Sequence, residues 1–450
     1  MLQLRCAAQN YDWGRNYQDS EVAKLARANG NDVDESKPFA ELWMGAHPNC
    51  PSKVAATGES LASVLAAHPA ALLGARVAEH FGQLPYLFKV LSVNKALSIQ
   101  SHPDKKLAER LHAEHPKMYA DPNHKPEMAL ALSDFEALCG FSATPQLQAR
   151  LAATPELAGL VGTRQVAALA ALPAGAAGQD DPAAKQALKA AFTHLMTAPP
   201  AAVTEAVRRL VARLQAKQAA QGAAALTEHE ALALRLNGQF PDDVGIFSAF
   251  FLNIVRLPAG SAIYLPANEP HAYLAGELVE CMAASDNVIR AGLTPKFKHA
   301  DVLCESLTYR QGLPDVLDGS PAGPGGAVRV YQPPFEEFEL QKLELAGGEV
   351  ELAASQGPRL LLVTAGEAEV AAAGGGLPAV LEAVKEVERR GVLRRGSIVL
   401  LAPGVEFAVR RAEGLVGWMA AVNSAFFALE GARQGAAAGG AAEAEAVAMA

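Results

Sequence analysis

Short apolar runs separated by turn residues occupy both ends of the chain, and a helical pattern occupies the middle. In the first 143 residues, the stretch GQLPYLFKVLSVNKALSIQ predicts strands followed by a turn. The next segment, HPDKKLAERLHAEHP, predicts a short helix with Leu107 and Leu111 on one face and a stop at Pro116. The N-terminal region is therefore predicted to be mainly β.

Between residues 144 and 240 the composition changes to Ala, Leu, Gln and Arg, and apolar residues recur at helical spacing in TEAVRRLVARLQAKQ. The segment TEHEALALRLNG opens with a capping box, Thr227 with Glu230, and its Asn237-Gly238 pair predicts the helix end. AALPAGAAGQDDPAA predicts a loop between helices. We interpret this region as a helical insert, and it carries no recognisable chemistry.

Strand patterns return after residue 241, and GSPAGPGG at 319–326 predicts a linker to a second β region. GSAIYLPANEPHAY before the linker and GSIVLLAPGVEFAV after it share a Gly-Ser start, an apolar strand and a Pro turn, which suggests a repeated β unit. Such a repeat fits two jelly-roll barrels of the cupin type. LPAVLEAVKEVERRG at 377–391 predicts a helical insertion in the second barrel.

The predicted fold class is thus mainly β with a helical insert, as two cupin-type jelly-roll barrels plus an α-helical domain. Residues 1–143 and 241–318 would form a discontinuous first barrel, 144–240 the helical domain, and 319–430 a second barrel without metal. The Ala/Gly-rich tail, 431–450, is predicted to be disordered.

Composition limits the partners and the compartment. The 450 residues include 39 Lys and Arg against 48 Asp and Glu, without a basic tract, which argues against nucleic acid or an anionic membrane as a partner. Five widely spaced cysteines without a CxxC pair indicate reduced thiols. The start MLQLRCAAQN is too short and polar for a signal peptide, and no apolar span would cross a bilayer. We expect a cytoplasmic protein; the sequence leaves its oligomeric state open, and a monomer is compatible with it.

Histidines indicate where a metal would bind. None follows His299, so the second barrel offers no imidazole. The candidates in the first barrel are His102, His112, His115, His124, His271 and His299. We interpret His112 and His115 as surface residues of the predicted helix, and His124 as a residue that packs against Pro126.

Polar residues alternate in SIQSHPD, where Ser98, Gln100 and His102 would share one face of a strand. Glu127 lies in HKPEM, where Pro126 keeps the backbone extended, and His271 follows two prolines at a predicted strand start. Two imidazoles, a carboxylate and an amide oxygen form a mixed N/O set that suits a catalytic zinc ion, whereas a structural zinc usually has thiolates. At each position the alternative is an ordinary packed or surface side chain.

A cationic cluster offers a site for an anion. NVIRAGLTPKFKH holds Arg290, Lys296 and Lys298 around a turn, where they would suit a phosphate; the alternative is a solvated basic loop. Lys89 and Lys125 lie near the candidate metal ligands in the sequence. A lysine close to a metal cation is unusual unless an anion lies between the two positive charges.

Six segments in order resemble the type I mannose-6-phosphate isomerase family. They are YDWG, ELWMGAHPNCPSKV, LPYLFKVLSVNKALSIQSHPDKKLAERLHAEHP, HKPEMALALSDFEALCGF, LPANEPHAY and ECMAASDNVIRAGLTPKFK. The chain departs from the family after YDWG, where it reads RNYQDSEV, and at 377–391. The resemblance covers residues 1–143 and 240–310 well and the rest weakly.

The resemblance implies a zinc-dependent cupin enzyme that interconverts mannose 6-phosphate and fructose 6-phosphate and supplies mannose 6-phosphate for GDP-mannose synthesis. It implies one Zn²⁺ per chain, held by Gln100, His102, Glu127 and His271, and Arg290 as a catalytic residue. The implied pocket residues are Ser98, Lys89, Lys125, Tyr273, Glu280, Asp286 and Lys296.

The chemistry would move a proton between neighbouring carbons through an enediol, which needs a positive centre and a base. The sequence leaves the base open among metal-bound water, Glu280, Asp286 and a lysine. Two other functions compete. A non-haem iron dioxygenase would usually need a further histidine where Gln100 stands. A non-catalytic sugar-phosphate sensor would be expected to lack a ligand or Arg290, and neither is missing.

Overall fold

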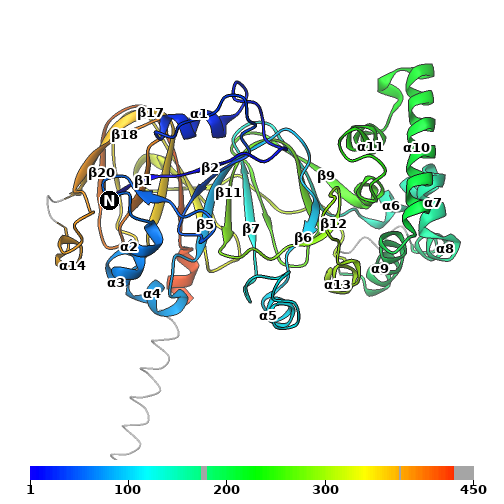
Figure 1. Ribbon diagram of the computed structural model, residues 1–450, viewed down its shortest axis with the longest axis horizontal. Coiled ribbons are helices and arrows are strands. Elements are labelled where there is room, and N and C mark those ends of the chain that lie inside the picture. The colour runs from blue at the N-terminus through cyan, green and yellow to red at the C-terminus, as the bar shows by residue number, and fades with distance from the viewer. Residues whose placement is uncertain (174–179, 374–376, 430–450) are drawn as a thin grey trace, which may run out of the picture.

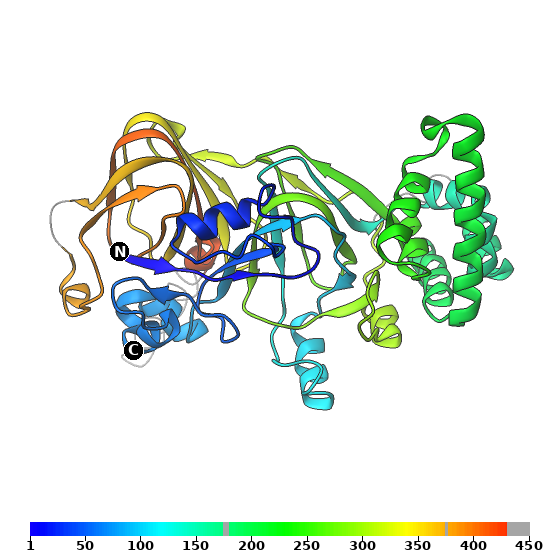
Figure 2. The ribbon, with the colours of Figure 1, turned by 45° about the horizontal axis from the view of Figure 1, so that its top comes forward.

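Two antiparallel sheets lie beside each other, and a group of helices extends from the far end of the first sheet (Figure 1). The structure is a computed structural model that describes residues 1–173, 180–373 and 377–429. The predicted disordered tail lies outside these residues. In a second orientation the helical group again stands apart from the second sheet, with the first sheet between them (Figure 2). The protein is thus rich in β-sheet with a separate helical region.

The first sheet contains eleven strands and carries most of the chemistry-bearing residues. Its strands are β2 (Ala8–Gln9), β3 (Glu41–Met44), β5 (Tyr86–Val93), β6 (Ile99–Ser101), β7 (Glu127–Ala131), β8 (Phe135–Phe141), β9 (Leu252–Leu257), β10 (Ala262–Leu265), β11 (His271–Ala283), β12 (Ile289–Gly292) and β13 (Val316–Leu317). Apolar residues dominate β5 and β11, which are buried along almost their whole length. These two strands therefore form the centre of the sheet.

Strand β11 changes partners along its length. Near His271 it pairs with β6 and β8, and from Gly276 onward it pairs with β5. Gly276 has φ +124°, and a Cβ there would lie 2.7 Å from the carbonyl oxygen of Asp134. Only glycine adopts this conformation without strain, so β11 can bend here and join both parts of the sheet.

The second sheet has nine strands, two of them from the N-terminal part of the chain. They are β14 (Ser320–Ala322), β15 (Val328–Tyr331), β16 (Glu339–Leu352), β17 (Arg359–Ala372), β18 (Arg390–Arg394), β19 (Ile398–Leu401), β20 (Phe407–Ala421), β1 (Leu2–Arg5) and β4 (Lys53–Val54). Strand β1 pairs with both β19 and β4. The N-terminal strand is therefore part of the same sheet as the strands after residue 319.

Two local predictions in this region are wrong. Part of the predicted linker, Ser320–Ala322, forms an edge strand, because its backbone pairs with β15. Of the predicted helical insertion, α14 (Ala379–Glu382) is helical, and its last residues instead begin β18, where backbone pairing with β17 outweighs helix propensity.

The helical region contains α6 (Thr144–Ala153), α7 (Pro155–Val161), α8 (Thr163–Ala170), α9 (Pro182–Met196), α10 (Pro200–Gln221), η1 (Ala223–Ala225), α11 (Glu228–Gln239), α12 (Gly245–Ser248) and η2 (Ala249–Phe251). Outside it lie α1 (Glu21–Ala28), α2 (Leu61–Ala67), α3 (Pro69–Leu72), α4 (Ala75–Phe81), α5 (Lys105–Glu114), α13 (Ala300–Ser306) and η3 (Pro324–Gly326). The predicted helices within 102–116 and 204–218 are confirmed as α5 and part of α10.

Helix α11 shows where local and tertiary signals differ. Its predicted capping box is present, with Thr227 and Glu230 bonded reciprocally. The predicted end at Gly238 is wrong, because the helix continues to Gln239. The Gln239 side-chain oxygen accepts a hydrogen bond from the backbone N–H of Ala96, 3.0 Å away. This tertiary contact explains why the last turn stays helical despite the glycine.

Continuous packing joins the three parts. One apolar core contains side chains from both sheets, such as Phe88 and Leu343, and a second joins the helical region to Ile99 of the first sheet. The hydroxyl group of Tyr86 in β5 lies 2.9 Å from the carbonyl oxygen of Ala420 in β20. Across the described residues, the structure contains no helix with the length and apolar character that a membrane crossing requires.

Candidate metal centre and substrate cavity

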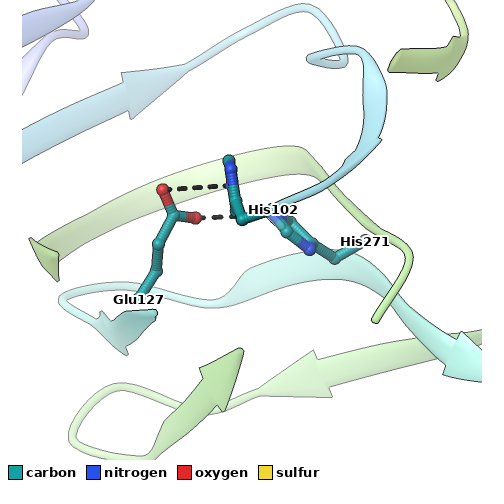
Figure 3. Close-up of side chains that lie close together, drawn as sticks. All are labelled: His102, Glu127 and His271. Carbon is teal, nitrogen blue, oxygen red and sulfur yellow. Dashed lines mark ion pairs between the residues drawn. The ribbon is translucent and has the colours of Figure 1, made fainter. Parts of the chain in front are cut away.

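Two histidines and one glutamate meet inside the first sheet (Figure 3). Nε2 of His102 lies 3.3 Å from Oε1 of Glu127, and Nε2 of His271 lies 3.4 Å from Oε2 of the same carboxylate. All three residues are at most 2 % exposed. In the described parts of the chain, they are the one group of three or more His, Cys, Asp or Glu side chains with ligand atoms close enough to share a metal ion.

The hydrogen bonds of the two rings fix which nitrogen carries the proton. Nδ1 of His102 lies 2.7 Å from the carbonyl oxygen of Asn287, and Nδ1 of His271 lies 3.1 Å from that of Glu269. A carbonyl can only accept, so in the neutral ring Nδ1 donates and Nε2 keeps its lone pair. Both Nε2 atoms are buried without a hydrogen-bond partner.

Lone pairs and carboxylate oxygens therefore face one another, an arrangement that a cation would stabilise. Burial lowers the pKa of His102 to about 4, so this ring is neutral near pH 7. Burial alone would raise the pKa of Glu127, but His102 and Lys125 lower it well below its usual value. Neutral imidazoles and an ionised carboxylate are the protonation states in which these groups bind metals. The residues thus fit a divalent cation such as zinc.

Strand register places Gln100 beside this group. Gln100 in β6 is the Cα partner of His271 in β11 and of Arg290 in β12. Directly paired residues on neighbouring antiparallel strands project to the same face. The Ser98 hydroxyl donates a hydrogen bond to Oε1 of Gln100, at 3.1 Å. The amide, a histidine and an arginine from three strands are therefore neighbours, as a fourth ligand at Gln100 would require.

Local sequence explains how the three strands present their side chains. Pro103 follows His102, whereas Pro126 and Pro270 immediately precede Glu127 and His271, the first residues of β7 and β11. Proline keeps the preceding residue extended and lacks an N–H for the ladder, which favours strand ends at these places. Nζ of Lys125, two residues before Glu127, lies 3.4 Å from Oε1 of that carboxylate.

A cavity of about 860 Å³ opens next to this centre. Six of the predicted site residues line it: Lys89, Ser98, Lys125, Asp286, Arg290 and Lys296. Arg290 is partly buried, and burial lowers its pKa. Lys298, the third member of the predicted cationic cluster, instead lies 3.4 Å from Asp243. With Lys95, five cationic side chains line the cavity, and Ser98 and Lys125 in its wall contact the candidate metal ligands Gln100 and Glu127.

The remaining two predicted pocket residues lie behind the cavity wall. Glu280 is 3 % exposed, and its Oε2 accepts a hydrogen bond from Nζ of Lys89, at 3.1 Å. Tyr273 is equally buried; burial, together with the charges of Glu280 and Glu127, raises its pKa. Glu280 and Tyr273 do not line the cavity, but they lie close enough to its charged residues to affect the electrostatics of the site.

Sequence reasoning assigned no role to several residues at this cavity. One of them, Asn49, donates to Oδ2 of Asp286 at 3.0 Å, while Nε2 of His47, which does not itself line the cavity, lies 3.3 Å from Oδ1. Both stand in the segment ELWMGAHPNCPSKV, which carried the resemblance. Gln239 and Phe240 also line the cavity and come from the end of α11. No local signal links that helix to the site, because the contact is between distant parts of the chain.

The other histidine candidates do not join the centre. His124 contacts Glu337, in the segment between β15 and β16, through Nε2, in addition to its place beside Pro126. Nδ1 of His112 lies 2.8 Å from the carbonyl oxygen of Tyr119, and His115 is exposed. His299 contacts the Tyr119 hydroxyl through Nδ1, at 3.1 Å.

Comparison with known proteins gives the family. The catalytic domain of phosphomannose isomerase type I matches residues 1–144, and the helical insertion domain of the same enzymes matches residues 160–252. Mannose-6-phosphate isomerase 1 from Arabidopsis thaliana is 40% identical over 433 residues, which cover 95% of each chain. The chain belongs to the type I phosphomannose isomerase family.

Further members of the type I phosphomannose isomerase family agree with this assignment. The mannose-6-phosphate isomerase of Aspergillus fumigatus is 41% identical, over 82% of this chain and 88% of its own. A phosphomannose isomerase from Salmonella typhimurium superimposes with a TM-score of 0.76 and 29% identity, covering 93% of this chain and 98% of its own. A mannose 6-phosphate isomerase bound with zinc and yttrium superimposes with a TM-score of 0.75 and 29% identity, over 93% of this chain and 98% of its own.

Proposed function

We propose that this protein catalyses the zinc-dependent interconversion of mannose 6-phosphate and fructose 6-phosphate through an enediol. The observation that carries the proposal is the pair of buried imidazole lone pairs facing one carboxylate, beside a cavity with several cations. The enzymes that resemble this chain over almost their whole length support the same activity.

His102, Glu127, His271 and Gln100 would hold one Zn²⁺ per chain. When bound, zinc would supply the positive charge that stabilises the sugar's reacting oxygens as they become negative. Ser98 positions the fourth ligand, because its hydroxyl bonds to Oε1 of Gln100. The carbonyl oxygens of Asn287 and Glu269 orient the two rings.

Three cations of the cavity would have different roles, according to their position. Arg290 is paired in register with Gln100 and so lies close to the metal ligands, where it would stabilise negative charge on the reacting oxygens. Lys296 follows β12 on a loop and would bind the phosphate, together with Ser98. Lys125 is close to Glu127 and would orient that carboxylate and the sugar hydroxyls.

Neither Asp286 nor Glu280, the two carboxylates considered as the base, is arranged as a strong general base. The pKa of Asp286 is lowered by its hydrogen bond to His47, which makes its carboxylate a weak base. Glu280 has a raised pKa because of burial, but it is paired with Lys89 behind the wall. We assign Asp286 a role in binding and Glu280 a role in setting the charge of Lys89.

The wider setting follows from the same proposal. The two sheets would each be a cupin-type jelly roll, with the domain boundaries given by the sequence. All five cysteines are free thiols in the structure, which supports a cytoplasmic location. There the product mannose 6-phosphate would serve GDP-mannose synthesis.

A coupled assay with mannose 6-phosphate, combined with metal analysis of the purified protein, tests the function. We expect about one zinc per chain, isomerase activity without oxygen uptake, loss of activity on chelation and recovery with zinc. His271→Ala should lose both zinc and activity, whereas His115→Ala, at an exposed position outside the centre, should keep both. Full turnover by the zinc-free protein would exclude the proposed centre, and oxygen consumption with Fe(II) would favour a dioxygenase.

A further inference from the structure

A buried arginine with two unpaired guanidinium nitrogen atoms lies in the second sheet. Arg359 is the first residue of β17, opposite Leu401 of β19 and Ala421 of β20, and it is 6 % exposed. Among the described residues, Nε and Nη2 of its guanidinium group have no hydrogen-bond partner. Burial lowers the pKa of Arg359 to about 10, so the group still carries its charge at neutral pH.

This side chain lines a cavity of about 350 Å³, formed at one end of the second sheet. The polar side chains around it are Glu339, Gln341, Glu351, Ser355, Gln356, Arg359 and Ser424. Val328, Leu352 and Phe427 contribute apolar surface. None of the residues that line this cavity lines the substrate cavity of the first sheet, so the two are separate sites.

Glu339, a buried carboxylate whose charge raises the pKa of Arg359, is already hydrogen-bonded elsewhere. Oε1 of Glu339 accepts from the Gln341 amide at 2.7 Å, and its Oε2 accepts from the backbone N–H and the hydroxyl of Ser424, at 2.9 and 2.7 Å. Glu351 also lines the cavity but is exposed. The guanidinium group therefore retains donors for a ligand.

The wall of the cavity is held in place from outside the sheet. Arg76 of α4 donates from Nη1 to the side-chain oxygen of Gln356 at 3.1 Å and from Nη2 to the carbonyl oxygen of Phe427 at 3.0 Å. These bonds fix two wall residues on different segments, so the cavity is preformed. A preformed wall lowers the entropic cost of binding a small ligand.

We propose that this cavity binds a small organic carboxylate through the guanidinium group of Arg359. The planar fork of arginine matches the two oxygens of a carboxylate, and such a pair would satisfy the buried donors. The apolar side chains beside it would pack against the organic part of the ligand. The cavity offers one guanidinium group, and the negatively charged Glu339 also lines it. This balance favours an anion with a single charge over inorganic phosphate, which carries more negative charge near neutral pH.

Crystals soaked with 4-bromobenzoate test the position, because bromine can be located by its anomalous scattering. We expect bromine in this cavity and the carboxylate within hydrogen-bond distance of Arg359. In solution, calorimetric titration should show saturable binding of 4-bromobenzoate and no binding of the neutral 4-bromobenzamide. Bromine only at other positions, or equal binding of the acid and the amide, would contradict the proposal.

Variants separate this site from the isomerase site. Arg359→Met should weaken 4-bromobenzoate binding by at least about tenfold, because it removes charged hydrogen bonds, and should leave the isomerase kcat unchanged. Arg359→Lys keeps the charge but loses the fork, so it should bind with intermediate affinity even if the Met variant fails to fold. Arg394→Met, at an exposed position on β18, is the matched control and should bind like the unaltered protein.

Three results would overturn the carboxylate site. The first is unchanged affinity in both Arg359 variants, and the second is an experimental structure in which Arg359 pairs with a carboxylate of this chain. The third is displacement of 4-bromobenzoate by an equal concentration of inorganic phosphate, which would assign the cavity to phosphate instead. Each of these outcomes is independent of whether the protein isomerises mannose 6-phosphate.

Discussion

Nε2 of His102 lies 3.3 Å from Oε1 of Glu127, although both atoms are acceptors while the histidine is neutral. Two acceptors facing each other in a buried site repel, and neither is solvated. This contact is unfavourable in the protein alone and becomes favourable when a cation lies between the atoms. Substitution of either His102 or Glu127 should therefore change the free energy of unfolding of the metal-free protein.

Glu127→Gln should destabilise the metal-free protein and weaken metal binding. The substitution leaves the buried Lys125, whose Nζ lies 3.4 Å from Oε1 of Glu127, without its carboxylate, which should lower the free energy of unfolding by about 2 kcal/mol even though the amide can donate a hydrogen bond to a histidine Nε2 atom. Loss of the charged ligand should lower zinc affinity by at least about tenfold. Thermal unfolding in chelator and a zinc titration measure the two effects. Glu109→Gln, an exposed position on α5, is the control. A metal-free Glu127 variant more stable than the unaltered protein would contradict a stabilising ion pair between Glu127 and Lys125.

Arg290→Lys should reduce activity without unfolding the protein. The shorter reach and missing fork of lysine should remove stabilisation of the developing negative charge and lower kcat by about a hundredfold. Steady-state kinetics with mannose 6-phosphate and a thermal melt provide the two readouts. Arg110→Lys, which is exposed on α5, should behave like the unaltered protein. If only KM changed, the role of Arg290 would be phosphate binding alone.

Lys89→Met should destabilise the protein, because it leaves buried carboxylates without their cation. Burial by itself would lower the pKa of Lys89, but Glu41 and Glu280 raise it above its usual value. Removal of one member of a buried pair costs about 3 kcal/mol. Urea unfolding should show this loss, and Lys89→Met combined with Glu280→Gln should recover part of it. A double variant less stable than Lys89→Met would contradict the pairing; Lys53→Met is an exposed control.

Glu277 should make stability depend on pH. Burial raises its pKa from 4.5 to about 7, despite the Ser92 hydroxyl and Arg15 beside it. Between these pH values the folded protein retains a proton that the unfolded chain has released. The free energy of unfolding should therefore fall as pH rises from about 4.5 to 7, by about 3 kcal/mol in total from this group.

Glu277→Gln cannot ionise and should remove that part of the slope. Urea unfolding at a series of pH values between 4 and 8 measures it, with Glu367→Gln, an exposed position on β17, as the control. The amide oxygen introduced by the substitution can still accept the hydrogen bond from Ser92. An identical pH slope in the unaltered protein and the Glu277 variant would exclude the shifted pKa.

Local patterns were sufficient for the helices α5 and α10, for the capping box of α11, and for the three strand ends that present His102, Glu127 and His271. In these places proline, capping residues and apolar spacing act within a few residues of the site they determine. Alternation in SIQSHPD also pointed correctly to a polar face on β6. The sequence therefore named the three side chains, His102, Glu127 and His271, that the structure brings together, while the fourth ligand, Gln100, stays a prediction.

Tertiary structure alone decided which distant groups surround them. The end of α11 at Gln239, the edge strand at Ser320–Ala322 and the pairing of β1 with β19 each depend on a backbone partner far away in the chain. Packing likewise places His47 and Asn49 against the carboxylate of Asp286. It also leaves two guanidinium nitrogen atoms of Arg359 buried without a hydrogen-bond partner. Local propensities act over a few residues, whereas hydrogen-bond partners, burial and charge neighbours are set only when separate strands come together.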